Sequence, residues 1–119
     1  KHNLLVMNLM MFELLFHPDA FSEIEALSPS MRAKALNALD KLEMLGNELR
    51  FPHTRAMGEG LFELRAGNKD ISRTFFAFAI GQKIYILRTF VKKTQKTPAS
   101  EIELALKRLG EMTDESTTH

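Results

Sequence analysis

Cysteine is absent from this chain of 119 residues, and tyrosine occurs only once, as Tyr85. Without cysteine there is no disulfide framework, no thiolate metal site and no cysteine nucleophile. The four histidines, His2, His17, His53 and His119, are scattered and form no HExxH motif or i, i+4 pair. The sequence also shows no recognisable motif for a nucleophilic triad, a glycine-rich phosphate loop or a pair of catalytic carboxylates. Metal binding is therefore poorly supported, and ordinary acid–base machinery is sparse.

Long hydrophobic runs are absent too, because no apolar stretch approaches the roughly 20 residues that cross a bilayer. The apolar-rich opening, residues 1–16, lacks the cleavage site of a secretory signal. We therefore expect no membrane association and, with no cysteine, a cytoplasmic protein. Lys1 is not an initiator residue, so we expect residues 1–10 to be a leader or a non-native remnant. The length predicts a single domain over residues 1–119, with a frayed tail at 113–119.

The formal net charge of +1 hides a strong asymmetry along the chain. Residues 50–96 contain ten Lys or Arg and three Asp or Glu, a local balance of +7. Residues 11–49 have a balance of −4 and residues 97–119 a balance of −3. If any part of the chain contacts a polyanion, it is the middle third.

Helical spacing precedes the basic region. Residues 11–16 are a short apolar run of strand type, and Pro18 then suits the first turn of a helix. Between Met31 and Leu45, apolar residues recur every three or four positions, which predicts a second helix that Gly46 would end. The two helices are expected to form a hairpin with one buried face.

Three strands are predicted next, at Leu61–Ala66, Ile71–Ile80 and Ile84–Val91, after a loop over residues 50–60. The tight turns between them predict an antiparallel meander, and the last two strands are apolar on both faces, so both faces should be covered. Thr97 is expected to cap a last helix that has Pro98 at its first position and an apolar stripe ending at Gly110. The fold class is therefore α+β, with two N-terminal helices on a small twisted sheet and a C-terminal helix.

The remaining candidates for functional groups are the guanidinium groups of arginine and the ammonium groups of lysine. Arg65 and Arg73 lie on neighbouring predicted strands, on the face away from the main hydrophobic alternation. Two adjacent arginines repel each other unless an anion lies between them, and a phosphate is such an anion. Lys92, Lys93 and Lys96 leave the third strand near the same edge.

A purely structural interpretation is also open for each of these cations. Arg65 could pair with Glu63 or Asp70, and Arg88 could be a satisfied structural cation. A pair of lysines beyond a strand is often only solubilising. Arg50, His53 and Arg55 are either solvated loop charges or part of a basic rim.

The order of these segments is familiar. It comprises Gly60-Leu61-Phe62-Glu63-Leu64-Arg65, then Arg73-Thr74-Phe75-Phe76, then Phe90-Val91-Lys92-Lys93-Thr94-Gln95-Lys96-Thr97-Pro98 with Glu101-Ile102, preceded by Leu49-Arg50-Phe51-Pro52. This pattern resembles the HigB-type toxins of the RelE/ParE superfamily, and within them the phage-derived group, from about residue 12 to residue 111.

The resemblance implies the RelE/ParE-like fold and a type II toxin that is neutralised by a cognate antitoxin, usually a HigA-like protein with a helix-turn-helix domain. It implies cleavage of mRNA on the ribosome by attack of the ribose 2′-OH, without metal or cofactor. Arg65 and Arg73 match arginines that bind and stabilise the phosphate, and Lys92 and Lys93 match the catalytic or RNA-contacting basic segment. Further RNA contacts are expected from four other cations of residues 50–96: Arg50, Arg55, Arg88 and Lys96.

The chain departs from this pattern in its general acid and base. Many relatives use a tyrosine or histidine near the active surface, whereas Tyr85 lies in mid-strand beside apolar neighbours. A lysine whose pKa is lowered by neighbouring arginines could serve instead. Two other functions stay open: a ParE-like toxin that acts on DNA gyrase, and a non-catalytic member that only binds its antitoxin.

Overall fold

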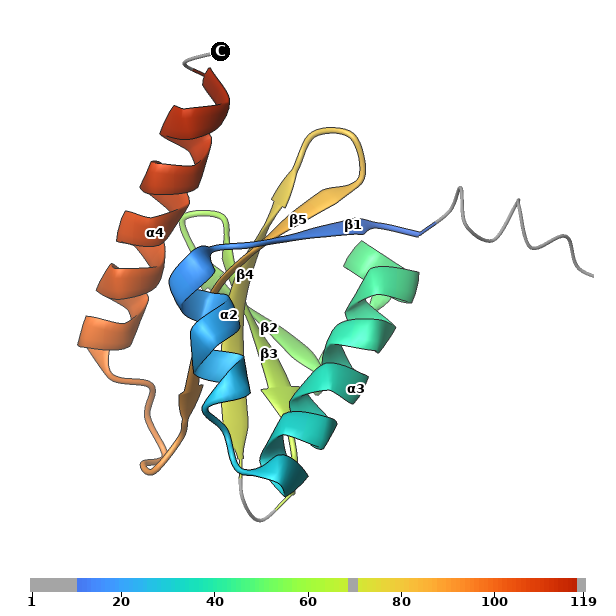
Figure 1. Cartoon of the computed structure of the whole chain (residues 1–119), viewed down its shortest axis with the longest axis vertical. Coiled ribbons are helices and arrows are strands. Elements are labelled where there is room, and N and C mark those ends of the chain that lie inside the picture. The colour runs from blue at the N-terminus through green and yellow to red at the C-terminus, as the bar shows by residue number, and fades with distance from the viewer. Residues whose placement is uncertain (1–10, 69–70, 118–119) are drawn as a thin grey trace, which may run out of the picture.

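Five strands form one sheet in the order β1-β5-β4-β3-β2 in a computed structural model that describes residues 11–68 and 71–117 (Figure 1). The predicted leader at residues 1–10 lies outside the described residues. The elements, in chain order, are β1 (Glu13–Phe16), α2 (Pro18–Glu25), α3 (Pro29–Leu45), the 3-10 turn η1 (Gly46–Glu48), β2 (Thr54–Gly58), β3 (Leu61–Ala66), β4 (Ser72–Ala79), β5 (Lys83–Val91) and α4 (Ala99–Thr117).

The predicted meander is confirmed as β3, β4 and β5, which pair antiparallel in chain order. Two features of the sheet differ from the prediction. The segment 50–60, interpreted as a loop, contains the edge strand β2, which pairs with β3. The sheet is mixed and not purely antiparallel, because β1 lies parallel to β5. The pairing of β1 depends on a partner strand that is distant in the chain, and β2 is a short edge strand beside β3. A local pattern of apolar residues does not reveal either pairing.

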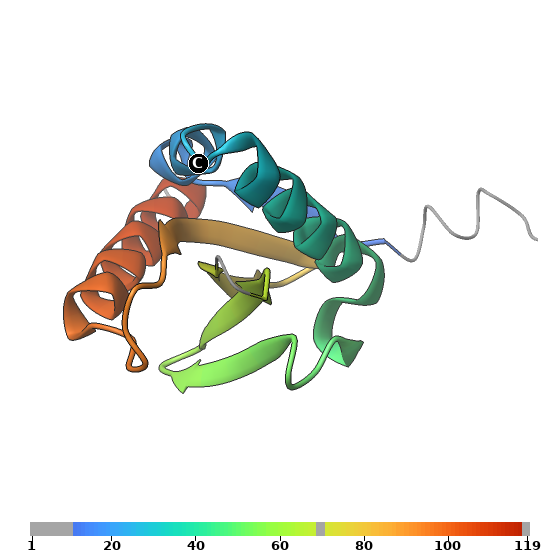
Figure 2. The same ribbon diagram turned by 90° about the horizontal axis from the view of Figure 1, so that it is seen from below.

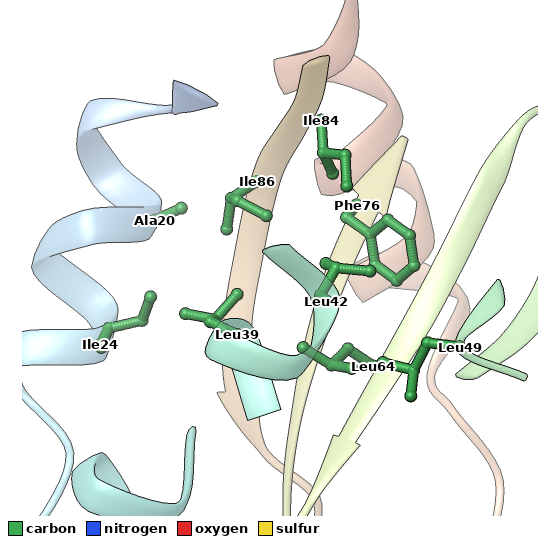
Figure 3. Packing of buried hydrophobic residues seen from close by; sticks show 9 residues of the cluster. All are labelled: Ala20, Ile24, Leu39, Leu42, Leu49, Leu64, Phe76, Ile84 and Ile86. Carbon is green, nitrogen blue, oxygen red and sulfur yellow. The ribbon is translucent and has the colours of Figure 1, made fainter. Parts of the chain in front are cut away.

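The first face of the sheet is covered by α2 and α3, and this is the predicted helical hairpin (Figures 1 and 2). Side chains from both helices meet alternate residues of β3, β4 and β5 in one apolar cluster. Figure 3 shows its nine members: Ala20, Ile24, Leu39, Leu42, Leu49, Leu64, Phe76, Ile84 and Ile86.

The second face is covered by α4, which lies on the other side of the molecule from α3 (Figure 2). Its Ala105 is buried in a second cluster with Phe75 and Leu87. Phe75 and Phe76 are neighbours in β4, so their side chains point to opposite faces, yet both are almost fully buried. The expectation that both faces are covered is therefore confirmed.

Both ends of α4 differ from the prediction. The helix begins at Ala99, and the Thr97 hydroxyl does not cap it but donates to Oε2 of Glu63 at 2.9 Å. The helix also continues through Gly110 to Thr117, so the tail expected to fray is helical over residues 113–117. Met112, beyond the glycine, still packs against the second cluster, and this contact favours the longer helix. None of the described helices is long and apolar enough to span a membrane.

Charged side chains tie α4 to α2 and β5. Glu23 of α2 accepts hydrogen bonds from Arg88 of β5 at 2.6 Å and from Arg108 of α4 at 2.9 Å. Its Oε1 also accepts the backbone N–H of Thr89 at 3.0 Å. Arg88 binds Glu101 of α4 as well, through Nε at 2.6 Å. One carboxylate therefore links three elements that are far apart in the chain.

Gly46 ends α3, as predicted, and the structure shows why no other residue suits the position. Its φ is +54°, and a Cβ at this position would overlap the ring of Phe12. We expect Gly46→Ala to lower the free energy of unfolding by about 3 kcal/mol, because backbone strain and steric overlap add. Urea denaturation measures this change. The matched control is Gly110→Ala, at a helical site with open space, which should stabilise the protein by about 0.5–1 kcal/mol. Equal effects of the two substitutions would contradict this account.

Candidate nucleic-acid site

Strand register places the candidate arginines together. Arg65 of β3 is directly opposite Arg73 of β4, and Arg55 of β2 is directly opposite Glu63 of β3. Because alternate residues of a strand share a face, Glu63 and Arg65 lie on one face, the same face as Arg73. The predicted approach of Arg65 and Arg73 across the ladder is confirmed.

Glu63 is the centre of this arrangement. Nε of Arg73 donates to Oε1 of Glu63 at 3.2 Å, and these two side chains are only 8% and 6% exposed. The Thr97 hydroxyl occupies the other carboxylate oxygen. Arg73 also donates from Nη1 to the carbonyl oxygen of Ser72 at 3.4 Å. Buried charges need such partners, so β3, β4 and the loop after β5 hold one another in place through Glu63.

We define the cationic cluster as Arg55, Arg65, Arg73 and Lys92, gathered around Glu63. Nη2 of Arg55 lies 3.9 Å from Oε1 of Glu63, and the Arg55 side chain is 55% exposed. Arg65 is exposed and, among the described residues, has no carboxylate partner. Asp70, its other possible partner from the sequence, lies outside the described residues. One buried carboxylate faces four cations, so the cluster keeps a positive excess that an anionic ligand would neutralise.

Two members of the cluster have shifted pKa values. Burial lowers the pKa of the Arg73 guanidinium, Glu63 opposes the shift, and the charges of Arg65 and Arg55 add to it. Arg73 still remains charged, because arginine side chains stay protonated in proteins. Burial, followed by the charge of Arg73, lowers the pKa of Lys92 from its ordinary value. A lysine with a lowered pKa beside arginines was expected from the sequence, and Lys92 is such a residue.

Two hollows open on the cluster and share Arg65, Arg73 and Lys92. The larger has a volume of about 420 Å³, and it is lined by Arg65, Ile71, Arg73, Lys92, Lys93, Thr94 and Gln95. The smaller, of about 60 Å³, is lined by Phe51, Pro52, His53, Thr54, Arg55, Glu63, Arg65, Arg73 and Lys92. A concave surface lined by fixed cations suits a phosphate group together with part of its nucleotide.

A third hollow, of about 430 Å³, continues from the cluster to α3. Arg65 and His53 line it on one side, and Lys34, Asn37 and Lys41 of α3 line it on the other. The lysines and the asparagine recur at positions i, i+3 and i+7, so one helical face supplies all three.

The structure brings Arg65, Arg73 and Lys92 together, and Lys93 lines the larger hollow beside them. Among the residues expected to bind RNA, Arg55 belongs to the cluster. Arg50 is exposed and lines an adjoining hollow of about 490 Å³ together with Arg55. Lys96 is exposed in the loop between β5 and α4, where its carbonyl oxygen accepts the Thr94 hydroxyl.

Arg88 requires a correction. It was expected to bind RNA, but it pairs with Glu23 and Glu101 and its guanidinium lies over the Phe90 ring at 5.8 Å. The hydrogen bonds that Arg88 donates to Glu101 and Glu23 raise its pKa. Arg88 is therefore the satisfied structural cation that the sequence left open. Tyr85 packs against the second cluster, as its apolar neighbours indicated.

Three residues of the site were not identified from the sequence. Glu63 was considered as a partner of Arg65, but in the structure Glu63 binds Arg73 in the protein interior. Thr97 was interpreted as a helix cap and instead holds Glu63. His53, interpreted as a loop charge, lines both the small hollow and the hollow beside α3. Within the described residues, no three His, Asp or Glu side chains are placed to hold a metal ion.

Solved structures with the same fold come from toxin–antitoxin systems. A double arginine-to-alanine mutant of the E. coli toxin RelE in the free state has a TM-score of 0.63 at 16% identity, covering 83% of this chain and 98% of that one. The RelBE2 toxin–antitoxin complex of Mycobacterium tuberculosis has a TM-score of 0.55 at 17% identity, covering 69% and 99%. The archaeal RelE–RelB complex of Pyrococcus horikoshii has a TM-score of 0.51 at 19% identity, covering 69% and 96%. At these identities the likeness establishes the fold.

Sequence comparison identifies the family. No curated protein matches the chain. Residues 22–110, however, match the family described as phage derived protein Gp49-like, and this range holds the whole cationic cluster. The chain therefore belongs to the phage-derived Gp49-like family and has the fold of the RelE toxins.

Proposed function

We propose that this protein is the toxin of a type II toxin–antitoxin system and that it cleaves mRNA on the ribosome, as HigB-type toxins do. The observation that carries the proposal is the pair Arg65 and Arg73, placed opposite each other beside Lys92, with Glu63 as the one carboxylate that the described residues place among them. Such a cluster suits a phosphodiester, whose charge grows in the transition state of cleavage. The RelE fold of the solved relatives supports the same activity class.

Cleavage would begin at the ribose 2′-OH. Its oxygen forms a bond to the adjacent phosphorus, its proton passes to a base, and the P–O5′ bond breaks as O5′ takes up a proton. The products are a 2′,3′-cyclic phosphate and a 5′-hydroxyl. Arg65 and Arg73 would stabilise the five-coordinate phosphorane, and Lys92, with its lowered pKa, would transfer a proton. The proposed reaction needs neither a metal nor a cofactor.

The other basic residues would hold the RNA strand and not take part in the chemistry. Lys93 lines the larger hollow, Arg50 and Arg55 line the adjoining hollow of about 490 Å³, and Lys96 is exposed in the loop between β5 and α4. Contacts of this kind fix the position of a nucleic acid without reading its sequence. Sequence or codon preference would then come from the ribosome or from residues that touch a base.

The partner we propose is an antitoxin of the HigA type, with a helix-turn-helix domain, in the cytoplasm. Two of the solved structures with this fold are toxin–antitoxin complexes, and this supports the assignment.

Primer extension on a translated transcript tests the proposal. Induction of the protein is expected to arrest growth and to produce new 5′ ends within the coding region. The matched control is the same transcript with its start codon removed, which should stay intact because it is not translated. Cuts in both transcripts would contradict ribosome dependence. Intact transcripts with inhibition of purified gyrase would support the ParE-like alternative, and intact transcripts with tight antitoxin binding would support a non-catalytic member.

A further inference from the structure

We infer that Phe51 is a stacking platform for the RNA base next to the cleaved phosphate, an inference that rests on the proposed function. The chain has eight other phenylalanines, and two of them, Phe75 and Phe76, are at most 1% exposed. Phe51, in contrast, is 77% exposed. A large apolar ring in water forgoes burial, so an occupant that covers it would gain stability.

The position of the ring relative to the cations indicates what kind of occupant fits. Phe51 lines the small hollow together with Arg65, Arg73 and Lys92. It also lines the adjoining hollow of about 490 Å³ with Arg50 and Arg55. An aromatic ring flanked by several cations is the arrangement by which proteins hold single-stranded nucleic acid, since the ring stacks on a base while the cations bind its phosphates.

The loop that carries Phe51 is anchored at both ends. The Thr54 hydroxyl donates to the carbonyl oxygen of Leu49 at 2.6 Å in the interior, and the His53 amide donates to the carbonyl oxygen of Arg50 at 2.9 Å. On the other side, the amide of Arg65 donates to the carbonyl oxygen of His53 at 2.9 Å. The backbone after Phe51 is therefore fixed to the strand that carries Arg65, and the backbone before it is fixed to His53 and Thr54. A base stacked on the ring would stand in a defined position relative to the phosphate held by the cluster.

The alternative occupant is an apolar segment of an antitoxin. Such a segment would place an uncharged side chain beside four cations and leave their charge uncompensated. A nucleotide satisfies both the ring and the cations at once, so the surroundings of Phe51 favour RNA.

Substitution at Phe51 tests the inference with two readouts. Phe51→Ala and Phe51→Leu are each expected to weaken binding of a short fluorescein-labelled oligoadenylate by roughly 5- to 100-fold in fluorescence anisotropy. Both should raise KM for cleavage of a ribosome-bound message more than they lower kcat. Phe51→Trp should bind at least as tightly as the wild type, because stacking needs a flat ring. The leucine variant keeps the apolar character and so separates stacking from simple burial.

The control is Ile80→Ala, which removes a side chain that is 95% exposed at the opposite end of β4 from Arg73. It should leave RNA affinity and KM unchanged. Wild-type behaviour of Phe51→Ala together with impaired Arg65→Ala would overturn the stacking role and leave the proposed function standing. Absence of RNA binding and cleavage in the wild type would overturn both. Loss of antitoxin affinity in Phe51→Leu with RNA affinity retained would assign the ring to the antitoxin instead.

Discussion

Arg65→Ala is expected to slow RNA cleavage by about 10²–10³-fold and to leave the melting temperature within a degree or two of the wild type. The rate effect is that of removing one preorganised donor to a developing anion. The stability effect is small because Arg65 is exposed and, within the described part of the chain, pairs with no carboxylate. Single-turnover cleavage of a ribosome-bound message and thermal unfolding measure the two quantities.

Arg65→Lys and Lys83→Ala are the matched variants. Lysine keeps the charge but loses the planar fork of donors, so an intermediate rate is expected. Lys83 is an exposed cation at the start of β5, away from the cluster, and its removal should change neither rate nor stability. If Arg65→Ala cleaved at the wild-type rate, Arg65 would have no part in catalysis.

Substitution of Arg73 would give a result that is harder to interpret than substitution of Arg65. Removal of Arg73 would leave Glu63 as a buried carboxylate without its main partner, a change that costs about 3–5 kcal/mol in buried ion pairs. Loss of activity in Arg73→Ala would then mix unfolding with chemistry. Arg65 and Arg73 face each other, but only Arg65 can be removed without disturbing the core.

Glu23→Ala is expected to lower the free energy of unfolding by about 3 kcal/mol, although Glu23 lies outside the cationic cluster. The substitution leaves Arg88 and Arg108 facing each other in a poorly solvated position, and it removes the acceptor of the Thr89 amide. α4 should loosen first, because Arg108 is one of its attachments to α2. Urea denaturation gives the stability change, and hydrogen exchange of α4 amides locates it.

The effect should depend on pH in a defined direction. Burial acts to raise the pKa of Glu23, but hydrogen bonds from Arg108, the Thr89 amide and Arg88 outweigh it, so the pKa lies below its ordinary value of 4.5. A carboxyl with a lowered folded-state pKa stabilises the protein above its unfolded-state pKa, and that contribution is lost as the pH falls through the folded-state pKa. The difference between wild type and Glu23→Ala should be full near neutral pH and shrink below about pH 4.5.

The control for this effect is Glu25→Ala, two residues away on the same helix. The Glu25 side chain is exposed, and only its backbone carbonyl accepts a hydrogen bond, from Arg32. Its removal should change stability by less than about 0.5 kcal/mol. Similar losses for both variants would mean that the Glu23 network adds little beyond an ordinary helix surface.

Local patterns determined much of this protein. The spacing of apolar residues fixed α2, α3 and the strands β3, β4 and β5, because burial of a face imposes a period of 3.6 or 2 wherever the element forms. The same alternation placed Arg65 and Arg73 on one face. The concentration of positive charge in the middle third was equally visible in the sequence, since charge along the chain requires no partner to be recognised.

Tertiary structure decided which of these cations are available to a ligand. Arg88 and Arg65 look alike in sequence, yet Arg88 meets carboxylates from α2 and α4 that lie far away in the chain, whereas Arg65 keeps its charge exposed. The parallel pairing of β1 with β5 and the hydrogen bond from Thr97 to Glu63 likewise arise from contacts between distant segments. A one-dimensional pattern shows which side of an element is polar. Only the packing of the elements shows whether a polar group there has found its counter-charge.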